Sequence, residues 1–155
     1  MDVSVSETID VPRDRVAHYV MDHRNDTTWI GGIGESELLG DAPHFGSDAE
    51  RRRVAAFLGK RIEYVLRVVE LDPDARLAMR SVQAPFPMEV TYSFSDAPGA
   101  TIITVRVQGE PSSVYRLAEP VLARQTRRSV GSDLRTLKGL LEGSTGDRGG
   151  AEAAG

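Results

Sequence analysis

A change in the hydrophobic period of the sequence constrains the fold more than any other feature. Between residues 33 and 108, apolar and polar residues mostly alternate, which is the pattern of β-strands. After Gly109-Glu110-Pro111 the apolar residues recur at helical spacing instead. Short turns separate the strand segments and can join only antiparallel neighbours. We therefore expect six antiparallel strands, at residues 33–39, 48–58, 60–71, 76–82, 88–95 and 101–108. One long helix should follow them.

The residues before this region predict one further strand and two short helices. Residues 3–9 alternate as a strand does, and Pro12 favours the start of a helix. Val16, Tyr19, Val20 and His23 then lie on one helical face, and a second short helical turn ends near Trp29.

The C-terminal part predicts a long amphipathic helix and then a tail. Pro120 should kink or restart the helix, because proline lacks the N–H and clashes with the preceding turn. From Gly143 onward no large apolar residue occurs, so we expect one domain at residues 1–142 and a disordered tail at residues 143–155. The apolar face should consist of Val114, Leu117, Ala118, Val121, Leu122, Gln125, Leu134, Leu137 and Leu141.

Composition narrows the class of protein. A chain of 155 residues with 40% apolar residues can bury one core. Its net charge of −4 argues against general nucleic-acid binding, which needs an excess of Lys and Arg. The absence of cysteine excludes disulfides, thiolate metal sites and cysteine nucleophiles. We find no signal-peptide pattern and no apolar run long enough to span a membrane, so we expect a cytoplasmic protein.

Three stretches resemble the helix-grip fold of the START-like (SRPBCC) superfamily, which includes polyketide cyclase/dehydrase and lipid-transport proteins. They are IDVPRDRVAHYVMDHRNDTTW, FLGKRIEYVLRVVELDPDARL and LAEPVLARQTRRSVGSDLRTLKGLLE. The resemblance implies an α+β fold, in which a curved antiparallel sheet of about seven strands wraps around a long C-terminal helix. It also implies an internal cavity for a hydrophobic small molecule. The protein would then be a polyketide cyclase/dehydrase-like enzyme promoting aldol cyclisation or dehydration, or a non-catalytic carrier of a lipid or apolar metabolite.

Strand alternation indicates which side chains face that cavity. Tyr64 and Tyr92 lie on the apolar faces of their strands. We predict that their hydroxyls orient a ligand carbonyl or act as general acids. The alternative is that each ring packs in the core and bonds to backbone or water. Met79 and Met88 share these inner faces, where they would contact an irregular apolar ligand or serve as plain packing.

The three consecutive arginines are divided between the two faces of a strand. Arg52 is expected on the outer face of the strand. Arg53 and Phe57 share the other face, which is expected to point inward. A buried arginine needs a partner or a ligand anion. We therefore predict that Arg53 and Phe57 contact the ligand, with Arg53 binding a carboxylate or enolate oxygen. Whether Arg51 or Arg53 faces the cavity stays open.

Three further residues complete the predicted site. His23 would transfer a proton at the mouth of the cavity, or it packs at the end of its helix. Trp29 would stack on the ligand, or it plugs the core. Gln125 would reach into the cavity, or it lies at the margin of the apolar helix face.

Other ligand classes find little support. Metal-ligand spacing, a dinucleotide-binding glycine pattern and a GxSxG nucleophile motif are all missing, so we expect no metal and no cofactor. The expected partner is a small hydrophobic or polyketide-like ligand, and the sequence leaves a homodimer open. The arginines of the long helix are solvated charges or a surface for an electrostatic partner; they are Arg124, Arg127, Arg128 and Arg135.

Overall fold

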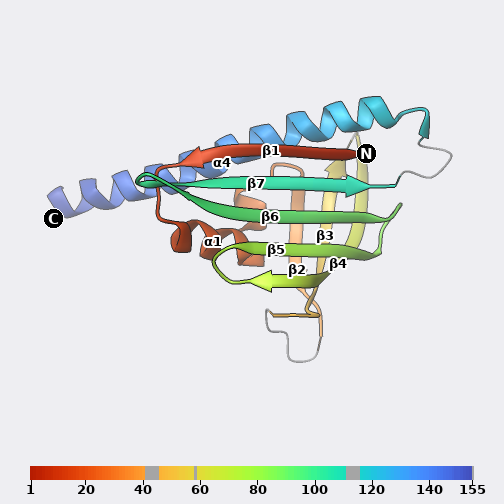
Figure 1. The fold of residues 1–155 in the computed structure, drawn as a ribbon, viewed down its shortest axis with the longest axis horizontal. Helices are drawn as coiled ribbons and strands as arrows, with labels where there is room; N and C mark the ends of the chain where they lie inside the picture. Colours follow the sequence, from red (N-terminus) through yellow and green to blue (C-terminus); the bar gives the residue numbers. More distant parts are fainter. Residues whose placement is uncertain (41–45, 58, 111–115, 155) are drawn as a thin grey trace.

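The computed structural model describes residues 1–40, 46–57, 59–110 and 116–154, with the side chains of all but residue 57 and residues 144–154. In these residues, seven antiparallel strands form a sheet in the order β1-β7-β6-β5-β4-β3-β2 (Figure 1). The strands are β1 (Asp2–Ile9), β2 (Ile33–Leu38), β3 (Glu50–Phe57), β4 (Lys60–Asp72), β5 (Arg76–Gln83), β6 (Met88–Ala97) and β7 (Ala100–Gly109). Each predicted strand is present.

The sheet is strongly curved, and β4 is where it bends. Its pairing with β5 shifts register between Val65 and Leu66 and again between Val68 and Glu70. Such irregularities bend a strand and increase its twist. In Figure 1, β2 and β3 consequently run across the direction of β1, β7 and β6. The curvature gives the sheet a concave inner face.

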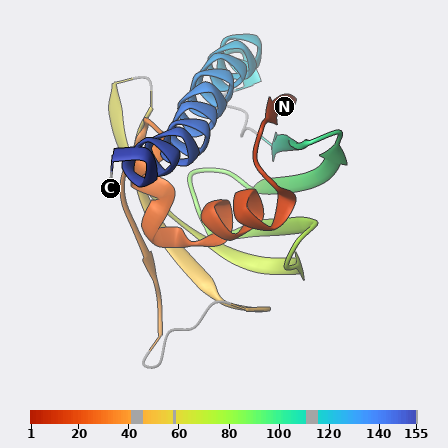
Figure 2. The same cartoon turned by 90° about the vertical axis from the view of Figure 1, so that its left-hand side faces the viewer.

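The helices cover this inner face. Between β1 and β2 lie α1 (Arg13–Met21), the short 3₁₀ helix η1 (His23–Asn25) and α2 (Asp26–Trp29). The long α4 (Glu119–Ala154) lies along the open side of the curved sheet (Figure 2). Leu134 and Leu137 of α4 are fully buried in the core that the sheet and α1 share. The α+β helix-grip fold predicted from the sequence is therefore confirmed.

The start of α4 differs in part from the prediction. Pro120 lies in the first turn of α4, where proline is tolerated. A turn at Leu117 and Ala118 separates α4 from the helical Arg116, so the helix restarts at Pro120 as one of the two predicted outcomes. Leu117 is 95% exposed and Val121 is 61% exposed, so placing them on the buried face was wrong. Leu117 precedes the helix, and Val121 is rotated by about 100° from the buried Leu122. Val114 lies outside the described residues.

In the structure α4 extends to Ala154, past the expected domain boundary at Gly143. The division into a domain at residues 1–142 and a tail at residues 143–155 stays a prediction. No described helix is both long enough and apolar enough to cross a membrane.

The packing of α4 on the sheet can be tested by truncating a core side chain. Leu134 is 0% exposed, so Leu134→Ala should lower the free energy of unfolding by about 2–5 kcal/mol. Denaturant unfolding measures this change. Leu140→Ala is the matched control, because Leu140 is 39% exposed on the same helix and should cost much less. Equal losses in the two variants would contradict the packing described.

Candidate functional site

A cavity in two adjoining parts lies between the inner face of the sheet and α4. The inner part has a volume of about 150 Å³ and the outer part about 220 Å³. Tyr64, Met88, Val107, Val130 and Asp133 line both parts, which therefore adjoin. Most of the remaining lining is apolar, with Phe86 and Leu122 in the outer part and Val90 and Val105 in the inner part.

The inner part contains a small set of polar side chains on otherwise apolar walls. Arg53, Tyr64 and Tyr92 come from β3, β4 and β6, and Asp133 comes from α4. A mostly apolar cavity with a few convergent polar groups is the usual form of a small-molecule site.

A buried carboxylate fixes the position of Arg53. Asp26 is fully buried, and its Oδ2 accepts a hydrogen bond from Arg53 Nε at 3.0 Å. The same oxygen accepts from Arg51 Nη1 at 3.2 Å and from Ser36 Oγ at 2.7 Å. Arg51 Nη2 also donates to the carbonyl of Met21 at 2.9 Å. The network thus connects α1, α2, β2 and β3.

One carboxylate therefore serves two guanidinium groups. Arg51 and Arg53 are 1% and 3% exposed, so both charges are held away from water. Burial, the largest single influence, would lower the pKa of Arg53, but Asp26, Tyr92 and Tyr64 together outweigh burial and raise that pKa well above its ordinary value. Arg53 is a fixed cation in the wall of the cavity. Its charge is only partly balanced, because Asp26 is shared with Arg51.

The two tyrosines carry hydroxyls beside this cation. Arg53 Nη2 donates to the Tyr92 hydroxyl oxygen at 3.3 Å, which leaves the hydroxyl proton of Tyr92 for another acceptor. Burial raises the pKa of Tyr64, while the charge of Arg53 acts in the opposite direction. Tyr64 is therefore a neutral hydrogen-bond donor at neutral pH. An adjacent cation strengthens a hydroxyl as a donor to a developing oxyanion.

Asp133 occupies the opposite wall. Its Oδ1 accepts a hydrogen bond from the backbone N–H of Gly31 at 3.0 Å. Burial raises the pKa of Asp133, and the Gly31 hydrogen bond lowers it by less. A carboxyl group with a raised pKa is suited to proton transfer near neutral pH. The sheet wall therefore supplies hydrogen-bond donors and the helix wall supplies a proton acceptor.

Four of the residues predicted from the sequence line the cavity together with Arg53. They are Tyr64, Tyr92, Trp29 and Met88. Trp29 packs edge-on against Tyr92, with ring centroids 6.1 Å apart. It is 3% exposed and so belongs to the core and to the cavity wall at once. Between the two arginines left open by the sequence, Arg53 lines the cavity and Arg51 lies behind it.

The remaining predicted residues are placed elsewhere. Met79 is fully buried opposite Val68 on β4 and is a packing residue instead of a wall residue. His23 is partly exposed and does not line the cavity, because it lies on η1, beyond the end of α1. Gln125 donates to Ser129 Oγ at 3.4 Å along the helix margin. The side chain of Phe57 lies outside the described residues.

Sequence reasoning missed Asp26 and Asp133. Asp26 had an indirect signal, because an inward-facing arginine requires a buried partner. The signal for Asp133 was direct. It lies three residues after Val130 and four before Leu137, on the face of α4 that packs inward.

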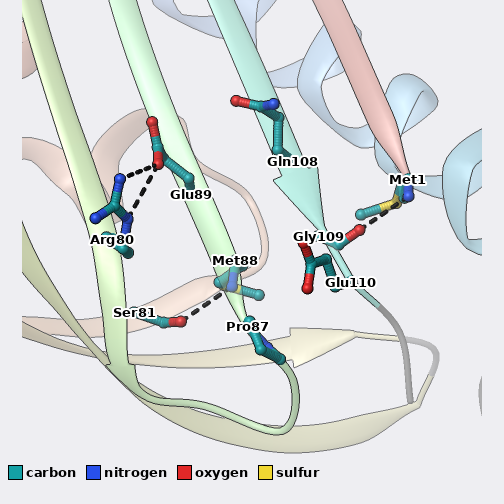
Figure 3. Close-up of a pocket in the computed structure, with 9 residues that line it drawn as sticks. All are labelled: Met1, Arg80, Ser81, Pro87, Met88, Glu89, Gln108, Gly109 and Glu110. Carbon is teal, nitrogen blue, oxygen red and sulfur yellow. Dashed lines mark hydrogen bonds and ion pairs between the residues drawn. The ribbon is translucent and has the colours of Figure 1, made fainter.

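A second pocket lies at the end of β5–β7 and has a volume of about 520 Å³ (Figure 3). Its polar groups are largely bonded to one another. Arg80 Nη2 lies 3.1 Å from Glu89 Oε2, and Met88 N donates to Ser81 Oγ at 3.0 Å. We therefore place the functional site in the internal cavity. In the described part of the chain, no cluster of three His, Asp or Glu side chains is arranged to hold a metal ion.

The sequence profile of the family described as "Polyketide cyclase / dehydrase and lipid transport" matches residues 1–142. The chain belongs to this family. No curated protein matches it. Solved structures agree on the fold, which is all that they show at such low sequence identity.

Three solved structures illustrate this similarity. Protein TTHA0849 of Thermus thermophilus has 20% identity and a TM-score of 0.78, covering 89% of this chain and 94% of that one. The Zhui aromatase/cyclase of a Streptomyces species has 18% identity and a TM-score of 0.74, covering 92% and 93%. A START superfamily protein of Mycobacterium smegmatis has 19% identity and a TM-score of 0.66, covering 92% and 95%.

Neutralising the shared carboxylate should destabilise the fold. Asp26→Asn leaves two buried guanidiniums without a counter-charge, so we expect a loss of about 3–5 kcal/mol in the free energy of unfolding. Denaturant unfolding measures this loss. The control is Asp22→Asn, which breaks the ion pair with the exposed Arg24 and should cost about 1 kcal/mol or less. A small change in Asp26→Asn would show that the network does not hold the wall together.

The raised pKa of Asp133 predicts a pH-dependent stability change. Because its folded-state pKa is raised, the native chain holds this proton more tightly than the unfolded chain. The stability due to that proton is present below the unfolded pKa and is lost as pH rises through the folded pKa. Asp133→Asn should therefore unfold at higher denaturant than the wild type at pH about 7. The difference should shrink towards pH about 3, and a variant less stable at neutral pH would contradict the assignment.

Proposed function

We propose that the protein is a polyketide cyclase/dehydrase-like enzyme that acts on an enolisable poly-carbonyl compound. The observation that carries the proposal is the pairing of opposite walls in one apolar cavity. Hydroxyl donors beside the Arg53 cation face the same space as the Asp133 carboxyl group. An aldol reaction needs both functions, one to polarise a carbonyl and one to remove a proton from the neighbouring carbon.

The first chemical step forms an enolate. A ligand carbonyl oxygen accepts hydrogen bonds from Tyr64 and Tyr92, whose donor strength is increased by Arg53. Asp133, ionised in this step, takes a proton from the adjacent carbon and becomes a carboxylic acid. The electron pair of the broken C–H bond moves onto the carbonyl oxygen, where the partly balanced charge of Arg53 stabilises it.

The second step closes the ring. The enolate carbon forms a C–C bond with a second carbonyl carbon of the same molecule, and that carbonyl oxygen takes the proton held by Asp133. The loss of water then uses Asp133 for two proton transfers. Asp133 removes a further α-proton and returns it to the departing hydroxyl, which leaves as water. The cavity holds the flexible chain folded, and this proximity supplies much of the acceleration.

A non-catalytic carrier of an apolar metabolite is the second candidate. The largely apolar outer part of the cavity favours it, with Ile33, Phe86, Leu122 and Val130 in its lining. The family description also includes lipid transport. A carrier needs the volume and the apolar walls but no proton-transfer group, so the role of Asp133 separates the two functions.

Turnover of a short synthetic poly-β-ketone thioester tests the enzymatic proposal. Asp133→Asn should lower kcat by about 10²–10⁴-fold, the usual contribution of a general base. Tyr64→Phe and Tyr92→Phe should each lower kcat through the loss of a donor to the oxyanion. Ring-closed product is measured by chromatography and mass spectrometry.

Two conservative variants serve as controls. Tyr19→Phe removes a hydroxyl that bonds to Thr28 Oγ1 outside the cavity, and Asp74→Asn removes an exposed carboxylate. Both should retain wild-type turnover. Native mass spectrometry of the purified protein then distinguishes the candidates: a retained apolar molecule without turnover supports the carrier and contradicts the enzyme. Homodimer formation and a cytoplasmic location stay predictions.

A further inference from the structure

The two faces of α4 differ in chemistry. Its inner face lines the cavity through Leu122, Thr126, Val130 and Asp133. Its outer face and the segment just before it, residues 116–135 in all, carry five arginines: Arg116, Arg124, Arg127, Arg128 and Arg135. Within this segment the carboxylates are Glu119, which binds the N-terminal ammonium at 2.7 Å, and Asp133 in the cavity wall. Over residues 116–135 the outer face therefore carries no unpaired carboxylate.

The arginines elsewhere on the surface provide the contrast. Arg67 pairs with Glu50 at 2.6 Å, and Arg106 pairs with Asp2 at 2.6 Å. Other surface arginines that make such ion pairs are Arg13, Arg24, Arg52, Arg61, Arg76 and Arg80. Among the described residues, by comparison, none of the five arginines at α4 has a carboxylate within ion-pair distance.

These arginines share their face with exposed apolar side chains. At 3.6 residues per turn, Val121, Arg124, Arg128 and Arg135 fall on one stripe of the helix. Val121 is 61% exposed, and Leu117 just before the helix is 95% exposed. The neighbouring Leu122 lines the outer part of the cavity, so the apolar end of the stripe lies beside the cavity wall.

We propose that this outer face of α4 binds an anionic lipid surface. Arginine guanidiniums form bidentate, charge-assisted hydrogen bonds with phosphate oxygens. Basic residues beside exposed apolar residues on one helix face are typical of peripheral membrane binding, with the apolar groups entering the boundary between headgroups and acyl chains. Leu117 and Val121 would enter the bilayer, and the arginines would bind headgroup phosphates.

An acidic protein would also match the charge, but the apolar residues favour lipid. A purely electrostatic partner gives no reason to expose Leu117 and Val121 beside the arginines. A bilayer also dissolves apolar molecules of the kind that the cavity is shaped to hold, and docking by α4 brings the outer part of the cavity close to it. The inference goes beyond the proposed function and holds for either an enzyme or a carrier.

Because the net charge of the chain is −4, membrane binding should depend on which face of the protein approaches the membrane and on the salt concentration. Because the chain as a whole is negative, an anionic membrane should favour the orientation in which the α4 face approaches it. Binding should therefore be lost on neutral vesicles and weakened strongly by salt, which screens exposed charges.

Co-sedimentation of the full chain with vesicles tests the proposal. One set contains phosphatidylcholine alone, and the other contains about 30% phosphatidylglycerol. We expect binding to the second set at low salt. The triple variant Arg124→Gln, Arg128→Gln, Arg135→Gln should bind about 100-fold more weakly, at about fivefold per arginine. Leu117→Ser should weaken binding by at least about fivefold.

A charge-matched triple variant is the control. Arg24→Gln, Arg76→Gln and Arg80→Gln change the net charge equally on ion-paired surface sites away from α4. This variant should bind as well as the wild type or nearly so. Equal weakening of the two triple variants, or no binding to anionic vesicles at low salt, would overturn the proposal. Binding to soluble polyglutamate but not to vesicles would also overturn it, in favour of an acidic protein.

Turnover and ligand retention separate this proposal from the proposed function. The arginine substitutions leave every side chain of the cavity wall in place. The α4 variant should therefore turn over a soluble substrate like the wild type, whether or not it binds vesicles.

Discussion

The shared carboxylate of Asp26 is the interaction on which the site depends. It lies at the start of α2 and binds Arg51 and Arg53 of β3 and Ser36 of β2. The three charged groups of the network are buried, so their bonds hold short helices and sheet in one geometry in a medium of low polarity. A buried charge network of this kind is weak evidence for stability in itself, since apolar residues can replace such networks at little cost. We therefore relate the network to the cavity that Arg53 faces, and not to stability alone.

The cavity separates two chemical tasks in space. Arg53, Tyr64 and Tyr92 are fixed by the sheet, whereas Asp133 is fixed by the long helix and by the N–H of Gly31. In the proposed mechanism the sheet wall stabilises negative charge on oxygen, and the helix wall accepts a proton. Because the helix-grip fold places α4 across the concave face of the sheet, it brings groups that are distant in sequence to opposite sides of one cavity. The same fold also leaves the other face of α4 available for an external surface.

Local patterns in the sequence predicted the fold and most of the sheet wall. Alternation placed Tyr64, Tyr92 and Arg53 inward because a strand side chain has only two faces to choose from. Met79 shares that alternation but lies deeper in the core, and alternation carries no information about depth. Asp26 could not be assigned, because its partners lie 25 and 27 residues away and meet it only through the curvature of the sheet. Leu117 was misplaced because the helix pattern was extended across the point where α4 begins, and Val121 because it is rotated by about 100° from the buried Leu122.

The central claim is that the Arg53 wall stabilises negative charge on a ligand oxygen. The most direct test is to bind a chromophoric naphthol, whose absorbance changes on ionisation, and to titrate the complex with pH. A nearby cation favours the ionised form, so the bound naphthol should have a pKa at least about one unit below that of the free compound. The shift should shrink in Arg53→Met, provided that this variant remains folded. A bound naphthol with an unchanged or raised pKa would contradict the claim and leave the cavity a purely apolar binding site.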